Sequence, residues 1–219
     1  MLLVRQAWWW AVKLGAGAMM LLVLACSGSE SPQTQRGTDS QTQPQAPVQT
    51  PAKVTEKAFV SGGKIEMQLD GGNYTVRSAG GNAIRVTLAG NVGAAKVDVT
   101  TENTHANVSV KETPRNNFQA TIEVPQTADL VIRLTAGDLT LDAVSGNKDI
   151  ESNAGNVDIV TGDSKDYASV DASVQAGDIK AEDFGQSQSG LFRKLTWSGK
   201  GKYTLRAKLI AGNLTLRSK

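Results

Sequence analysis

Cysteine and histidine are almost absent from this chain of 219 residues, and their scarcity excludes several kinds of chemistry. Because Cys26 is the only cysteine, no intramolecular disulfide can form. His105 is the only histidine, so a zinc site or a histidine general base lacks the partner residues it needs. No serine lies in a G-x-S-x-G elbow. We therefore expect His105 to be a solvated loop residue, and we predict no catalytic residue, no metal and no cofactor.

Net charge is also nearly absent. The chain has 23 Lys and Arg residues and 21 Asp and Glu residues. Arg5 and Lys13 precede Cys26, whereas every acidic residue follows it, so 21 basic residues face 21 acidic ones beyond that point. Nucleic-acid binding depends largely on neutralising phosphates, so this balance argues against a nucleic-acid partner. It also argues against attachment to a membrane through a polybasic surface.

The N-terminus has the pattern of a secretory signal peptide. Arg5 and Lys13 precede an uncharged stretch, L-G-A-G-A-M-M-L-L-V-L-A, at residues 14–25. A helix of that length spans about 18 Å, which is short for a hydrocarbon layer about 30 Å thick. We therefore predict a signal peptide at residues 1–25. The alternative is an uncleaved anchor that extends back through Trp8 and places Lys13 inside the apolar layer.

The residues Val23-Leu24-Ala25-Cys26 resemble the bacterial lipobox. The resemblance implies that Cys26 is diacylated and becomes the first residue of the mature chain, so Cys26 is the predicted lipidation site. Two or three acyl chains hold a protein on a membrane stably. Ser27, rather than Asp, follows the cysteine, which for a Gram-negative lipoprotein implies delivery to the outer membrane. The alternative is that Cys26 is a buried apolar thiol within the signal peptide.

Composition divides the rest of the chain into two parts. Residues 26–57 are rich in Ser, Gln, Thr and Pro and have too little apolar surface to offset the ordering entropy, so we predict a disordered linker. From residue 58 to 219 the sequence alternates at period two, as in K-I-E-M-Q-L, A-T-I-E-V and D-L-V-I-R-L. These short runs, bounded by Gly or Asn, predict half-buried strands and an all-β domain.

Glycines recur at fixed intervals in the predicted β domain. Four of them fall nine residues apart from Gly63 to Gly90, and three more from Gly137 to Gly155. Equal spacing is typical of a solenoid whose coils stack on one another, with Gly at each corner and aliphatic residues pointing inward. The alternative is a β-sandwich of hairpins, which also gives short strands at this spacing. The predicted corner glycines are Gly63, Gly72, Gly81, Gly90, Gly137, Gly146, Gly155, Gly177 and Gly212.

The segments V-P-Q-T-A-D-L-V-I-R-L-T-A-G-D-L-T-L-D-A-V-S-G (124–146), N-A-G-N-V-D-I (153–159) and G-K-G-K-Y-T-L-R-A-K-L-I-A-G-N-L-T-L (199–216) resemble the bacterial "putative adhesin" family DUF4097. The resemblance covers roughly residues 58–219 and rests on a recurring pattern. It implies a single-stranded right-handed β-helix, called a toastrack, and a lipoprotein or cell-surface module. No catalytic residues are established for that family, so the resemblance implies none here.

Two further groups of residues have competing interpretations. Asp138, Asn156, Asp178 and Asn213 occupy equivalent corners and could offer oxygens to calcium, but alternation of Asp with Asn is better explained by avoidance of stacked like charges. The segment at 190–203 mixes aromatic and basic residues, and we interpret it as the cap of the last coil, with contact to an anionic ligand as the alternative. Its residues are Trp197, Arg193, Lys194, Lys200 and Lys202.

The sequence favours a non-enzymatic, lipid-anchored binding or scaffolding module of the bacterial cell envelope. Its partners would be the membrane, through Cys26, and an envelope protein or glycan. One alternative is a regulatory partner in envelope-stress signalling. Another is a glycan-active enzyme on a β-helix, for which Asp138, Glu151 and Asp158 are the candidate acids.

Overall fold

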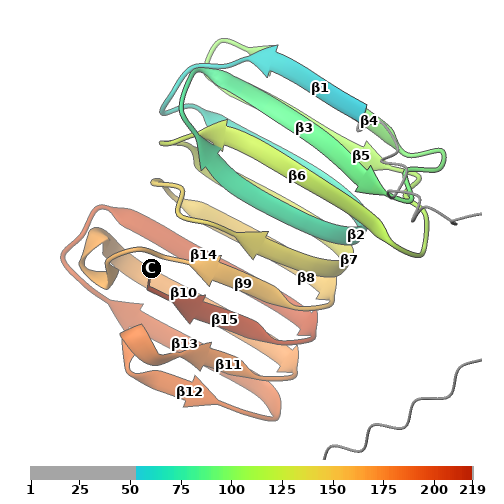
Figure 1. The fold of residues 1–219 in the computed structure, drawn as a ribbon. Helices are drawn as coiled ribbons and strands as arrows, with labels where there is room; N and C mark the ends of the chain where they lie inside the picture. Colours follow the sequence, from blue (N-terminus) through green and yellow to red (C-terminus); the bar gives the residue numbers. More distant parts are fainter. Residues whose placement is uncertain (1–52, 219) are drawn as a thin grey trace, which may run out of the picture. The chain divides into compact units, whose positions relative to one another are not determined.

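The computed structural model describes residues 53–218, and this part of the chain is all-β, as the alternating pattern predicts (Figure 1). Cys26, the predicted signal peptide and most of the predicted linker lie outside the described residues. Within 53–218 the only helical elements are two 3-10 turns, Ser164–Asp166 and Glu182–Phe184, and no helix there is long and apolar enough to cross a membrane. The strands are β1 (Lys53–Ala58), β2 (Lys64–Ala79), β3 (Ala83–Gly90), β4 (Lys96–Glu102), β5 (His105–Lys111), β6 (Phe118–Pro125), β7 (Asp129–Leu141), β8 (Lys148–Ala154), β9 (Val157–Val160), β10 (Tyr167–Ala176), β11 (Ile179–Ala181), β12 (Gln186–Gln188), β13 (Leu191–Ser198), β14 (Tyr203–Ala211) and β15 (Leu214–Arg217).

Two long strands, β2 and β7, each take part in two series of paired strands. Their first parts pair with β5 and β8, and their last parts pair with β6 and β9. We call β4-β5-β2-β7-β8-β14-β10-β13 the first ladder and β1-β3-β6-β2-β7-β9-β15-β11-β12 the second ladder. We call one turn of the chain through both ladders a coil, and we call the part of a coil that lies in one ladder an arm.

The order of the coils in space differs from their order in the sequence. The last coil, β14 and β15, lies between the coil of β8 and β9 and the coil of β10 and β11 (Figure 1). Pairing between these coils is parallel, whereas the strands at the ends of both ladders pair antiparallel. The middle of each ladder thus consists of parallel strands, and both ends of each ladder consist of antiparallel pairs.

The core lies between the two ladders and is built from the inward side chains of each arm. In the first ladder the register aligns one column of aliphatic residues directly, and each of them is almost fully buried. Full burial of one such side chain stabilises the fold by about 1.5 to 3 kcal/mol for the larger ones. The column is Met67, Ile132, Ile150, Ala207, Ala172 and Leu195.

A stack of glycines forms the corner that joins the two ladders. Gly72, Gly137, Gly155, Gly212 and Gly177 follow one another in this column, all with positive φ. A Cβ on any of the last four would overlap the carbonyl oxygen of a glycine in the neighbouring coil. Glycine at this corner therefore lets the coils approach at the spacing of paired strands.

The nine-residue spacing of the glycines corresponds to one arm of a coil. Gly137 and Gly155, eighteen residues apart, stack on each other, whereas Gly146 lies at the next corner against the carbonyl of Ala128. Gly81 and Gly90 lie further along the first coil, where Gly90 approaches the carbonyl of Asn117 and Gly81 has open space. Gly63 precedes β2 without positive φ and lies against Phe59 and the carbonyl of Thr104.

Strand β1 begins at Lys53, five residues before the boundary that composition predicts for the β domain. It pairs antiparallel with β3 from Lys53↔Leu88 to Ala58↔Ala83. Its side chains are mostly exposed, so it adds little to the core. This explains why its composition resembles a linker although its backbone is paired.

The glycine stack predicts a difference between two substitutions at similar φ. Gly155→Ala should lower the free energy of unfolding by at least about 3 kcal/mol, because φ is +118° and the new Cβ meets the Gly137 carbonyl. Gly81→Ala, at φ +128° with open space, should cost only about 1 to 2 kcal/mol. Urea unfolding of the two variants measures both values. Equal losses would contradict the role given to close backbone approach.

Candidate functional site

A column of hydrogen-bonded Asp and Asn side chains runs beside the glycine stack. Asp138 Oδ1 accepts from the backbone N and Nδ2 of Asn156, at 3.1 and 3.0 Å. Asn156 Oδ1 accepts in turn from N and Nδ2 of Asn213, at 3.3 and 3.0 Å. Asn213 Oδ1 accepts from the backbone N of Asp178 at 3.1 Å. We call these four residues the corner column. The Oδ1 atoms of Asp138, Asn156 and Asn213 each accept from a neighbouring coil. No group of three metal-ligating side chains occurs within 53–218.

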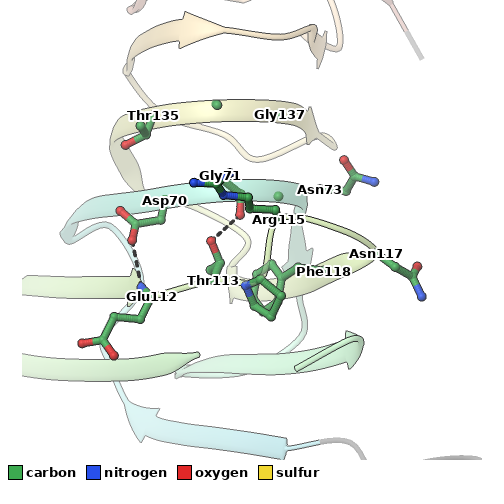
Figure 2. Close-up of a pocket in the computed structure, with 13 residues that line it drawn as sticks. Asp70, Gly71, Asn73, Glu112, Thr113, Arg115, Asn117, Phe118, Thr135 and Gly137 are labelled. Carbon is green, nitrogen blue, oxygen red and sulfur yellow. Dashed lines mark hydrogen bonds between the residues drawn. The ribbon is translucent and has the colours of Figure 1, made fainter. Parts of the chain in front are cut away.

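An open hollow of 590 Å³ lies where the glycine stack begins (Figure 2). It is formed by the bend of β2, the facing residues of β7 and the loop that connects β5 to β6. We call it the corner hollow. Its polar lining residues are Asp70, Asn73, Glu112, Thr113, Arg115, Asn117 and Thr135.

The loop at 112–117 is fixed over β2 by two hydrogen bonds. The backbone N of Glu112 donates to Asp70 Oδ2 at 2.9 Å, and Thr113 Oγ1 donates to the carbonyl of Gly71 at 2.6 Å (Figure 2). Glu112 and Asn117 have φ of 56° and 53°, so a non-glycine residue at each end of the loop adopts the left-handed conformation. The loop is therefore held in a defined shape beside the hollow.

The corner hollow offers hydrogen-bonding groups of both kinds. Asp70 and Glu112 are acceptors, the threonines and asparagines can donate and accept, and Arg115 is an exposed donor with no ion pair within 53–218. His105 does not line the hollow: it is the exposed first residue of β5, with Nδ1 3.4 Å from Thr104 Oγ1. The arrangement suits recognition of a polar ligand and pairs no nucleophile with a histidine base.

The three acids considered for a glycan-active enzyme do not form one cluster. Asp138 belongs to the corner column. Glu151, on the first ladder, lies 3.3 Å from Arg133 Nε and 3.6 Å from Lys208 Nζ. Asp158, on the second ladder, accepts from Arg217 Nε at 2.9 Å. Each carboxylate is thus occupied by a different neighbour.

The fold places the five residues predicted as a cap or an anion contact in different environments. Trp197 is half-buried and packs on Phe184, with ring centroids 5.1 Å apart. Arg193 points inward, and its buried Nε has no hydrogen-bond partner within 53–218. Lys194 is exposed on the outer face of β13, whereas Lys200 and Lys202 lie in or beside the turn before β14.

Strand β8 begins with a lysine whose side chain lies inside the domain. Lys148 is 3% exposed, and its Nζ donates to the carbonyl of Gly146 at 3.1 Å and to Tyr167 Oη at 3.0 Å. The Tyr167 hydroxyl donates to the carbonyl of Thr161 at 3.2 Å. Burial lowers the pKa of Lys148 to about 8, although Asp129 and Asp166 act in the opposite direction. Its only sequence signal is a lysine at an inward position of an alternating strand.

No family model matches the chain, and no curated protein matches it. Among solved structures, the chain is similar to a "putative cell adhesion protein" from Clostridium sporogenes, with 13% identity over 77% of this chain and 100% of that chain and a TM-score of 0.49. It is also similar to a "putative adhesin" from Bacteroides fragilis, with 9% identity, 76% and 97% coverage and a TM-score of 0.27. A "putative adhesin" from Parabacteroides distasonis gives 8% identity, 76% and 70% coverage and a TM-score of 0.25.

The lowered pKa of Lys148 predicts that the free energy of unfolding rises with pH. Above pH 8 the folded state releases the Lys148 proton, whereas the unfolded chain keeps it up to the ordinary pKa of 10.5. The unfolded state then binds more protons, so the free energy of unfolding should increase by about 2 to 3 kcal/mol between pH 7 and 10. Burial raises the pKa of Tyr74 and Tyr167, which reverses the trend above their ordinary pKa of 10.

Urea unfolding across this pH range measures the effect. Lys148→Met should remove the rise, because no buried amine then titrates. Lys180→Met, at an exposed position of β11, is the matched control and should keep it. A rise that survives in Lys148→Met would show that another group is responsible.

Proposed function

We propose that the chain is a non-enzymatic lipoprotein of the bacterial cell envelope and that its β domain is an adhesin-like binding or scaffolding module. The lipobox-like residues 23–26 and the preceding apolar stretch support acylation of Cys26, and Ser27 supports delivery to the outer membrane. The composition of residues 26–52 supports a disordered tether. The parallel coils support a β-solenoid of the kind that the DUF4097 resemblance implies.

The corner hollow is the observation that carries this proposal. It combines an exposed Arg115, which makes no ion pair with the residues that the structure describes, with amide, hydroxyl and carboxylate groups on a loop and two strands. Such a set recognises a ligand rich in hydroxyl and other polar groups, so an envelope glycan is the ligand class that it fits best. Ligand binding by groups already held in place avoids much of the ordering cost of association.

The anchor is tested by fatty-acid incorporation. When cells are supplied with an alkyne-labelled fatty acid, the natural chain should incorporate the label and Cys26→Ser should not, because acylation requires the thiol. Ser29→Ala is the matched control and should remain labelled. Mass spectrometry of the mature natural chain should find Cys26 at its N-terminus. A mature chain that retains residues 1–25 would contradict the anchor.

The ligand site is tested with Arg115→Ala in the full chain. Loss of a charged hydrogen bond should weaken binding to isolated envelope glycan by about tenfold or more. Lys57→Ala, on β1 and away from the hollow, should bind as the natural chain does. Binding is measured by co-sedimentation with murein sacculi and with envelope polysaccharide.

The same samples test the absence of catalysis. Prolonged incubation of the chain with these polymers should release no new reducing ends. Release that is lost in Asp138→Asn, Glu151→Gln or Asp158→Asn would contradict a non-enzymatic function.

A further inference from the structure

Two exposed apolar side chains lie in one row on the outer face of the first ladder. Phe192 of β13 is 81% exposed, and Ile210 of β14 is 49% exposed. Strand β10 separates β13 from β14, and its Ala176 pairs with both Leu191 and Ala211. This register places Gln175 between Phe192 and Ile210. Phe192 and Ile210, from separate segments of the chain, thus flank Gln175, and we call these two residues the apolar cluster.

Three cations lie in the two rows beside this cluster. Ser173 of β10 pairs with Lys194 on one side and with Lys208 on the other, and Asp171 pairs with Arg206. The three cations, together with the carboxylate of Asp171, line an open hollow of 590 Å³ over β10. Lys208 Nζ lies 3.6 Å from Glu151, but Lys194 and Arg206 make no ion pair within 53–218. We call Phe192, Ile210, Lys194, Arg206 and Lys208 the docking face.

The backbone at the start of β13 directs Phe192 outward. Phe192 has φ of 53°, the left-handed conformation that a bulky residue seldom adopts, and it follows Gly190 at φ 113° by two residues. Arg193, the next residue, is half-buried, and Phe192 is the more exposed of the two. The exposed Phe192 ring is therefore held by a backbone conformation that is specific to this point of β13.

We propose that the docking face binds an anionic phospholipid surface. The apolar cluster enters the headgroup region, while the three cations lie among the lipid phosphates. This proposal rests on the lipid anchor proposed above, because the anchor keeps the domain beside a bilayer. The balanced charge of the whole chain excludes a broadly polybasic surface, but the docking face is local and combines cations with apolar side chains, as interfacial segments do.

The chain between the anchor and the domain is long enough for this contact. Cys26 and Lys53 are 27 residues apart, which allows a reach of about 90 Å when extended. From β1 to β13 the strand order has eight spacings of about 4.8 Å, or about 40 Å in all. The tether can therefore span the domain and bring β13 to the membrane that holds Cys26.

The test uses the full acylated chain in vesicles, with an environment-sensitive thiol probe at Gln175→Cys. Because Cys26 is the only natural cysteine and is acylated, the probe reacts only at the new site. Vesicles contain phosphatidylcholine alone or phosphatidylcholine with phosphatidylglycerol. At low salt the probe should give blue-shifted, stronger emission with phosphatidylglycerol only. A probe at Thr75→Cys, exposed on the second ladder, is the control and should report water in both.

Variants of the docking face make the test specific. Each lysine near an anionic surface contributes roughly fivefold to binding, so Lys194→Gln with Lys208→Gln should lower the docked-to-free ratio by about 25-fold. Phe192→Ser with Ile210→Ser should also return the probe to aqueous emission. These positions are exposed, and an unchanged circular dichroism spectrum confirms that each variant is folded.

Four outcomes would overturn the proposal. Aqueous emission in both vesicle types, from a chain that floats with the vesicles, refutes docking and leaves the anchor intact. A chain that does not float contradicts the anchor and removes docking with it. Equal emission shifts in both vesicle types refute recognition of anionic lipid. A shift that depends on protein concentration without vesicles shows that a second copy occupies the face.

Discussion

The close approach of one glycine backbone to the next at a shared corner is the constraint on which the architecture depends. A side chain at Gly155 or Gly212 would separate adjacent coils in both ladders at once, because the corner belongs to both. The residue before each glycine in this column is small, as in Ala136, Ala154 and Ala211, and the residue after it is Asp or Asn. Close stacking between coils that are distant in the sequence therefore explains why Ala-Gly-Asx recurs.

The choice between Asp and Asn in the corner column follows from position in the stack. Asn156 and Asn213 lie inside the column, where each side chain accepts from one coil and donates to another. An ionised Asp can only accept, so Asp fits at the ends, where Asp138 and Asp178 lie. The same order keeps the two carboxylates apart, in agreement with the avoidance of stacked charge expected from the sequence.

Local pattern predicts that residues 53–218 are all-β, because the alternation of apolar and polar residues depends on neighbouring positions in the chain. It does not predict that β14 and β15 insert between earlier coils, since parallel pairing across many residues has no local signature. The loop at 112–117 is recognisable as a loop from Pro114 and its asparagines, but not its place over Gly71. Likewise, only the strand register shows which residues surround Lys148 and which residues lie side by side on the docking face.

The two ends of the domain are closed in different ways, and the difference bears on what kind of partner the docking face can contact. At one end Lys53 Nζ reaches the carbonyl of Ala95, which joins β1 to the residue before β4. At the other end β13 is an edge strand of the first ladder with Arg193 pointing inward. An inward charge on an edge strand opposes the addition of another strand, because it would have to be buried further. The exposed Phe192 and Ile210 are therefore poorly explained by strand pairing at that edge. Their exposure on the outer face favours contact perpendicular to the sheet, with a flat surface.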